Sequence, residues 1–190
     1  MTEGQLHTEL NSGRLSKERI SGLVAILEVH PKLTGNVLQE VFLQDKSESF
    51  NASWVLDHLM RKRLVYLLPH MDAFTKGLST LTNESAIRPM AHTCEMLCEA
   101  YFKVKDPVFI RTISDAHLER IMTACFDWFI GPHKVAAKVF AMSSLYYLGT
   151  KFSWVHPELK QILEDTISQG TAGYKNRGKK TLDKLIQLGH

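Results

Sequence analysis

The sequence predicts an all-α protein, and three observations support this. Apolar residues recur at the i, i+3, i+4, i+7 spacing of one helix face, as they do at Ile20, Leu23, Val24 and Leu27. No segment keeps the apolar–polar alternation of a strand, and only 64–68 is short enough to suit either state. A helix from Gly131 to Gly149 would be apolar on nearly every side and therefore buried.

Roughly nine helices are expected, and capping residues, prolines and glycines mark their ends. Ser16 can cap the first helix, and Pro31 ends it. Pro69 suits the first turn of the fourth helix, because its missing N–H is not needed there. Short connections favour antiparallel helix pairs. The expected helices span about 17–30, 32–44, 51–62, 69–79, 84–103, 115–130, 132–149, 157–170 and 172–188.

The remaining segments are predicted to be less regular. Residues 1–14 are polar, and we expect a flexible segment with at most a short helical turn around Leu6 and Leu10. Residues 45–50 are predicted to form a loop, and 104–114 a packed loop around Pro107. Residues 15–190 are predicted to form a single domain.

A short pattern, small-x-cation-x-x-small, occurs three times. It occupies Ala86–Ala91, Ala136–Ala141 and Gly173–Gly178, at steps of 50 and 37 residues. Each copy follows another amphipathic helix, which makes the repeating unit a helix hairpin and favours a helical solenoid. The small residues let neighbouring helices approach closely, while the cation extends outward over apolar surface.

Four stretches of the sequence support a resemblance to a known family. They are Asn51–His58, Lys134–Met142, His156–Lys160 and Gly170–Lys180. In these stretches the chain resembles the HEAT and armadillo-like repeat proteins, and more narrowly a group of small bacterial HEAT-like proteins without an assigned activity. The resemblance implies a right-handed α-α superhelix of about four to five antiparallel helix pairs. It implies no particular activity.

Composition narrows the class of protein. The net charge of +3 is only mildly basic. Three cysteines are an odd number, and they lie within apolar helical patterns, which indicates free buried thiols in a reducing compartment. The N-terminal segment lacks the apolar core of a signal peptide, and the apolar runs are too short to span a membrane. A cytoplasmic protein is therefore expected.

Few residues have the spacing of a catalytic or metal site. Cys94 and Cys98 lie one helical turn apart, but a structural zinc site needs four ligands. We therefore prefer the explanation that both cysteines are buried in the hydrophobic core. His117 is more than two turns from Cys125, too far to activate that thiol as a nucleophile. The segment 170–173 precedes a helix and is an alternative anion site. We expect no cofactor, no metal and no enzymatic activity.

The favoured function is a non-catalytic interaction or scaffold module that binds another protein. The cations of the final helix are predicted to spread around it, and a polar terminal cap is the preferred explanation for them, with contact to an acidic partner or a phosphate backbone as the alternative. The residues proposed for a binding surface are Arg88, Lys138, Lys175, Arg177, Lys179 and Lys180.

The alternative function is nucleic-acid binding. In DNA-alkylation-repair HEAT proteins, which the chain resembles here, aromatic residues and an aspartate line a concave surface. The corresponding pairs are Trp54 with Asp57, and Asp127 with Trp128. An aspartate against an aromatic wall could stabilise a cationic glycosidic transition state. The competing explanation is that both tryptophans are buried for packing.

Overall fold

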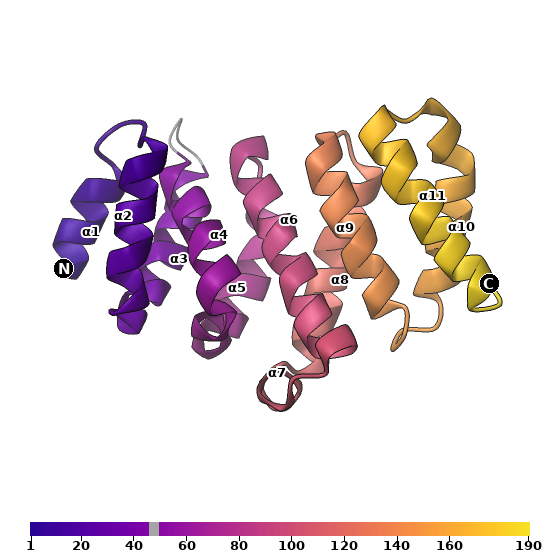
Figure 1. Ribbon diagram of the computed structural model, residues 1–190, viewed down its shortest axis with the longest axis horizontal. Coiled ribbons are helices and arrows are strands. Elements are labelled where there is room, and N and C mark those ends of the chain that lie inside the picture. The colour runs from indigo at the N-terminus through magenta and orange to yellow at the C-terminus, as the bar shows by residue number, and fades with distance from the viewer. Residues whose placement is uncertain (46–49) are drawn as a thin grey trace. The chain divides into compact units, whose positions relative to one another are not determined.

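The structure is a computed structural model that describes residues 1–45 and 50–190 (Figure 1). All regular elements in these ranges are helical, which confirms the all-α prediction. The expected loop at 45–50 lies outside the described residues for positions 46–49. None of the described helices combines the length and the apolar character needed to cross a membrane.

The chain divides into two compact units, Met1–Thr93 and Cys94–His190, where the sequence predicted one domain from residue 15 onward. The division falls inside a continuous helix, α6 (Glu84–Cys98). The boundary between Thr93 and Cys94 has no glycine or polar linker to mark it, and Pro89 lies inside the same helix, so composition does not reveal it.

The N-terminal unit is built from short helices in two layers. Helix α4 packs against α2 and α3, and α1 packs against α3. Pro69 lies inside a 3-10 segment and not at the first turn of the following α-helix. Before α6 the elements are α1 (Glu3–Leu10), α2 (Lys17–Glu28), a 3-10 turn (Pro31–Leu33), α3 (Thr34–Gln44), α4 (Asn51–Arg63), a 3-10 segment (Leu64–His70), α5 (Met71–Gly77) and a 3-10 turn (Leu78–Thr80).

Helix α1 is longer than the short turn expected in this polar segment. Leu6 and Leu10 are buried, and Thr2 caps the helix by accepting a hydrogen bond from the backbone N–H of Gln5. The Gln5 side chain accepts a bond from the Thr2 backbone in return, so the helix start is a capping box. Two buried leucines and a satisfied N-terminus account for the order of 3–10.

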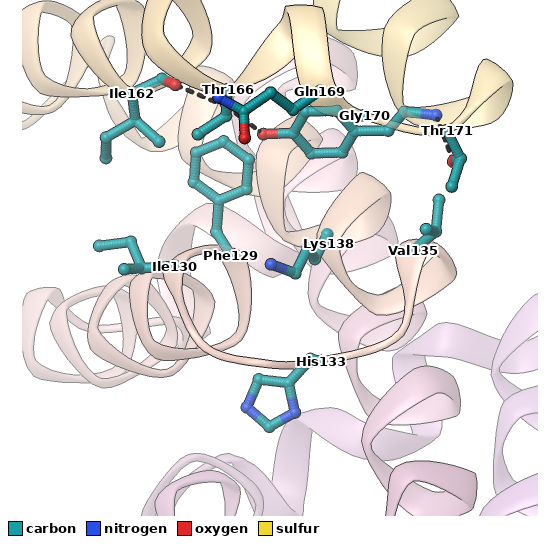
Figure 2. A pocket seen from close by; sticks show the side chains of 11 residues that line it. Phe129, Ile130, His133, Val135, Lys138, Ile162, Thr166, Gln169, Gly170 and Thr171 are labelled. Carbon is teal, nitrogen blue, oxygen red and sulfur yellow. Dashed lines mark hydrogen bonds between the residues drawn. The ribbon is translucent and has the colours of Figure 1, made fainter.

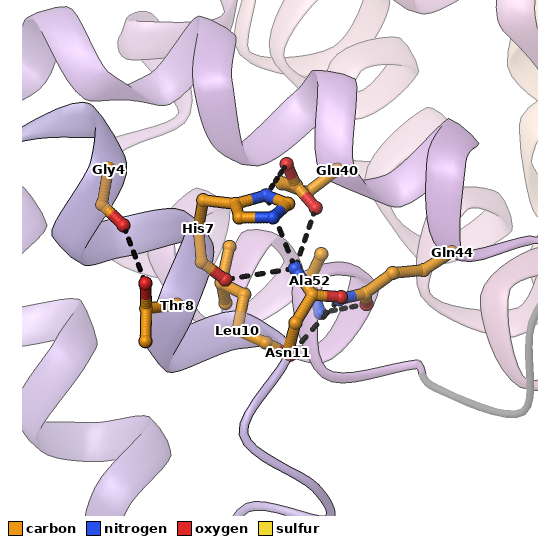
Figure 3. Close-up of polar contacts among 8 residues, drawn as sticks. All are labelled: Gly4, His7, Thr8, Leu10, Asn11, Glu40, Gln44 and Ala52. Carbon is orange, nitrogen blue, oxygen red and sulfur yellow. Dashed lines mark hydrogen bonds and ion pairs between the residues drawn. The ribbon is translucent and has the colours of Figure 1, made fainter.

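Polar side chains of α3 contact the end of α1 (Figure 3). The Glu40 carboxylate lies 2.7 Å from His7 Nδ1 and accepts a hydrogen bond from Asn11 Nδ2 at 3.0 Å. Gln44 Nε2 donates to the Leu10 carbonyl at 3.0 Å. Asn51 Nδ2, at the start of α4, donates to the same carbonyl at 2.9 Å. His7 and Asn11 thus contact Glu40, and the Leu10 carbonyl accepts buried hydrogen bonds from Gln44 and Asn51.

A buried carboxylate organises the start of α6. Asp45 is 7% exposed and accepts hydrogen bonds from the backbone N–H of Thr82 at 2.9 Å and of Asn83 at 2.8 Å. The Thr82 hydroxyl donates to it as well, at 2.9 Å. Asn83 then accepts from the backbone N–H of Ser85, one of the N–H groups that lack a partner within the helix.

Replacing Asp45 with Ala should lower the free energy of unfolding by about 2–3 kcal/mol, because three donors would lose a charged acceptor in a buried site. Chemical unfolding followed by circular dichroism measures this change. The matched control is Asp72→Ala, since the Asp72 carboxylate is 70% exposed. Equal losses in the two variants would contradict the capping role of Asp45.

In the C-terminal unit, helix α9 packs against α8, α10 and α11. It is the helix expected to be buried, and Ala137, Ala141, Met142, Leu145 and Leu148 are fully enclosed. The unit contains a π-helical continuation of α6 (Glu99–Val104), α7 (Pro107–Thr112), α8 (Asp115–Ile130), α9 (Val135–Leu148), α10 (Val155–Thr166), a 3-10 turn (Ile167–Gln169) and α11 (Ala172–Gln187).

The segment expected as a packed loop at 104–114 contains the short helix α7. Asp106 caps this helix through a bond from the backbone N–H of Val108, and Phe109 and Ile113 are buried. Ser114 caps α8 by accepting a hydrogen bond from the backbone N–H of His117. A capped single turn and a packed loop have the same apolar residues, so the sequence pattern does not separate them.

The repeated small-x-cation-x-x-small pattern falls on α6, α9 and α11. Its last small residue is buried in every copy, as Ala91, Ala141 and Gly178. A Cβ at Gly178 would meet Ile167 Cγ1 at 3.0 Å and Leu163 Cδ2 at 3.4 Å, so this position allows close approach of α10 and the turn after it. This position of the pattern is explained by helix packing.

The three cysteines are free and buried. Burial raises the pKa of the Cys94 thiol well above its usual value, and Cys125 adds to the effect by hydrogen bonding and by its charge. Burial also raises the pKa of Cys98. The thiolate is the reactive form of cysteine, so these thiols are inert core residues.

His156 packs against the C-terminal end of α9. Its ring stands against Gly149, where any Cβ would collide with it. The Nε2 atom is 2.8 Å from the Tyr146 carbonyl oxygen, and Nδ1 is 3.2 Å from His190 Nε2. Burial lowers the pKa of His156 below its usual 6.5, and His190 lowers it further, while the bond to Tyr146 opposes both.

A lowered histidine pKa makes the fold less stable in acid. The unfolded chain binds the proton at a higher pH than the folded chain, so this stabilisation is complete above about pH 6.5 and declines as the pH falls. We expect His156→Gln to reduce the pH dependence of the unfolding free energy below pH 6.5. His30→Gln, at an exposed position, is the control. The same slope in wild type and His156→Gln would contradict this assignment.

Candidate functional site

A groove with a volume of about 510 Å³ lies along α9 and α11 of the C-terminal unit. It combines cationic, acidic, aromatic and hydroxyl side chains, and one of its walls includes the end of α6. The residues that line it are Glu95, Ser143, Tyr146, Tyr147, Arg177, Lys180, Thr181, Asp183, Lys184 and Gln187.

Three cations of α11 form a stripe on the groove side. Arg177, Lys180 and Lys184 are at positions i, i+3 and i+7, which share one face of a helix. The prediction that the cations spread around the helix is wrong for these three. The groove residues do not include Lys175, Lys179, Arg88 or Lys138, so the stripe contains only two of the six cations proposed as a surface.

Arg177 is fixed in the groove by two partners. Its Nη1 atom donates to Glu95 Oε1 at 3.1 Å and to Ser143 Oγ at 2.5 Å. The Ser143 hydroxyl donates in turn to the Val139 carbonyl at 3.2 Å. The Arg177 side chain is still 41% exposed. Part of the guanidinium therefore faces the groove in a set orientation.

Two tyrosines form the aromatic part of the groove. The rings of Tyr146 and Tyr147 meet edge to face at 5.7 Å, and Lys184 Nζ lies 5.3 Å from the centre of the Tyr146 ring. Desolvation raises the pKa of Tyr147, and the Glu99 carboxylate raises it further. The Tyr147 phenol consequently stays protonated and can donate a hydrogen bond.

Lys138, the cation of the central helix, lies elsewhere in the same unit. It lines a second cavity of about 360 Å³, which lies between α8, α9, α10 and the segment before α11 (Figure 2). Lys138 is half-buried. The sequence placed it in one surface with Arg177 and Lys180, but the structure assigns Lys138 to one cavity and the other two to the groove.

The predicted repair pair Trp54 and Asp57 belongs to a polar cluster in the N-terminal unit. The Asp57 side chain is 3% exposed, and it accepts a hydrogen bond from Arg61 Nη2 at 2.6 Å. Asp57 Oδ1 is 2.6 Å from His92 Nδ1. Arg88 lies over the Trp54 ring, 5.3 Å from its centre. Both the carboxylate and one face of the indole are therefore already in contact with protein groups.

The second predicted pair, Asp127 and Trp128, does not form a site. Trp128 is 2% exposed and packs in the core, whereas Asp127 is exposed. Neighbouring residues of a helix point about 100° apart, which separates the two side chains. Trp128 is explained by packing, as the competing prediction proposed.

Among the described residues, no three or more His, Cys, Asp or Glu side chains are placed to hold a metal ion. The chain matches no family model, no curated protein and no solved structure. A function is therefore inferred from the groove and the cavity themselves.

Sequence reasoning missed most of the groove. Glu95, Ser143, Tyr146 and Tyr147 were not among the proposed site residues, and neither was Lys184. The i, i+3, i+7 spacing of Arg177, Lys180 and Lys184 was the available signal. Nothing in the sequence places Glu95 beside Arg177, because 82 positions separate them.

Asp57 is expected to serve stability. Asp57→Ala would deprive Arg61 and His92 of their acceptor and should lower the free energy of unfolding by about 1–3 kcal/mol. Asp127→Ala, at an exposed position, should change it by less than about 0.5 kcal/mol. Urea unfolding of both variants measures the difference. Unchanged or increased stability in Asp57→Ala would indicate that the carboxylate is kept for another purpose.

Proposed function

We propose that this protein is a non-catalytic interaction module, and that its α9–α11 groove binds a net acidic segment of another protein. The observation behind the proposal is the stripe of Arg177, Lys180 and Lys184 along one face of α11. Lys180 and Lys184 are exposed, and Arg177 is oriented by Glu95 and Ser143. A preorganised arginine loses less conformational entropy on binding a carboxylate.

The rest of the groove suits a protein ligand. Tyrosine and arginine are enriched at protein interfaces, where they combine apolar area with hydrogen bonding. Tyr146 and Tyr147 supply both, while Thr181 and Gln187 can bond to a peptide backbone. Three cations and two carboxylates line the groove, so a partner segment with a moderate excess of acidic residues fits it best.

We further propose that the module is a HEAT or armadillo-like repeat acting in the cytoplasm, with about four to five helix pairs in a right-handed superhelix. The repeated pattern on α6, α9 and α11 supports the repeat class, because its last small residue is buried each time. Three buried free thiols support a reducing compartment.

Nucleic-acid binding is the second candidate, and the observation that favours it is the placement of cations beside aromatic rings. Proteins that bind single-stranded nucleic acids combine a basic groove with aromatic rings on which the bases stack. Glu95 and Asp183 oppose it, since nucleic-acid interfaces are strongly positive. We therefore favour the protein ligand.

The test uses fluorescein-labelled probes and anisotropy at about 50 and 200 mM NaCl, a range over which phosphate contacts weaken strongly. The probes are a twelve-residue peptide of alternating Glu and Ser, a single-stranded oligonucleotide and a duplex. We expect the peptide to bind, and Lys180→Gln/Lys184→Gln to weaken it by about tenfold, or 1.4 kcal/mol, because two ionic contacts are lost.

The matched control is Lys175→Gln/Lys179→Gln, which removes the same charge from the same helix outside the groove. This variant should bind the peptide nearly as well as the wild type. Equal weakening by both double variants would mean that net charge, and not the groove, attracts the peptide. Tighter binding of an oligonucleotide than of the peptide at both salt concentrations would favour the second candidate.

A further inference from the structure

The cavity that Lys138 lines is separate from the groove and has the properties of a small-molecule site. Its volume of about 360 Å³ is in the range of ligand pockets in proteins. Its walls come from α8, the following loop with His133, α9, α10 and the 169–174 segment, and they are mostly apolar. The apolar and aromatic residues that line it are Phe129, Ile130, Val135, Ile162 and Tyr174.

The hydroxyl groups at the cavity wall already satisfy one another. Thr166 Oγ1 donates to the Ile162 carbonyl at 2.6 Å and lies 2.7 Å from the Tyr174 hydroxyl (Figure 2). Since Thr166 uses its proton for the carbonyl, Tyr174 donates to Thr166. Burial raises the pKa of Tyr174, so its phenol is neutral and its proton is engaged. This pair forms a neutral wall and brings no charge to the cavity.

Lys138 is different, because nothing in the described residues neutralises it. No ion pair or hydrogen bond to its amine is found in the described ranges, and the cavity residues described include no Asp or Glu. Figure 2 shows the amine turned into the space that Phe129 and Ile130 border. An ammonium group partly removed from water gains most from an anionic partner.

The start of α11 adds to this preference. Gly170 and Thr171 line the cavity, and Thr171 caps α11 by accepting from the backbone N–H of Tyr174. The N-terminal end of a helix has a partial positive charge that favours anions. The cavity thus combines a positive helix end and an unpaired lysine with apolar walls.

We infer that this cavity binds a small organic anion, a carboxylate attached to an aromatic or branched apolar body. Lys138 pairs with the carboxylate, and the body lies against Phe129, Ile130 and Ile162. This site is independent of the α9–α11 groove, so neither proposal depends on the other.

The test compares 3-phenylpropionate with its neutral isostere 3-phenylpropionamide, and with inorganic phosphate. Binding is followed by the amide resonances of Gly170 and Thr171 and by titration calorimetry. We expect the carboxylate to bind at least tenfold more tightly than the amide. Lys138→Met, which keeps an unbranched apolar stem, should reduce carboxylate binding to the amide's level and leave amide binding unchanged.

Two further variants complete the design. Lys138→Arg retains the charge and should keep at least part of the preference for the carboxylate. Lys179→Met removes an exposed lysine of α11 and should bind like the wild type. Thermal unfolding of each variant shows that it is folded before binding is measured.

Three results would overturn the proposed anion site or part of it. Equal affinity for the carboxylate and the amide, or an unchanged preference in Lys138→Met, would overturn the role of Lys138. Equally tight binding of inorganic phosphate would overturn the need for an apolar body. No shift of the Gly170 and Thr171 resonances at about 10 mM 3-phenylpropionate, near the weak limit of specific binding, would overturn the site itself.

Discussion

The burial of α9 is the constraint on which the C-terminal unit depends. This helix contacts α8, α10 and α11, and small residues such as Ala137 and Ala141 let its neighbours approach. Its less buried positions then open onto two different spaces. Lys138, near its start, lines the 360 Å³ cavity, while Ser143, Tyr146 and Tyr147 line the groove. One packed helix therefore positions both candidate binding surfaces.

Much of the helical framework was predictable because it depends on local chemistry. The spacing of Leu23, Val24 and Leu27 predicted α2, and Ser16 caps it as expected. Pro31 separates α2 from α3, and the apolar composition of the central stretch predicted the burial of α9. Helix ends and buried faces follow from residues within a few positions of one another, so the sequence contains the necessary information.

The polar contacts could not be predicted in the same way, because they join distant residues. Asp57 looked like a catalytic carboxylate beside Trp54, but its acceptor role toward Arg61 and its approach to His92 depend on how α4 meets α6. Asp45 reaches the backbone of 82–83 across 37 or more positions. Polar residues in a helix look exposed in the sequence until the packing shows which of them are covered. Helix α1 was underestimated for another reason, because only Leu6 and Leu10 among its mostly polar residues are buried.

The inert thiols have a practical consequence for studying the molecule. Cys94, Cys98 and Cys125 are fully enclosed, and burial keeps Cys94 and Cys98 protonated. A single cysteine introduced at an exposed position would thus be the preferred target of a thiol-reactive dye or spin label, with the native cysteines left in place. Because the native cysteines are buried and unreactive, the protein can be labelled at a chosen point on its surface.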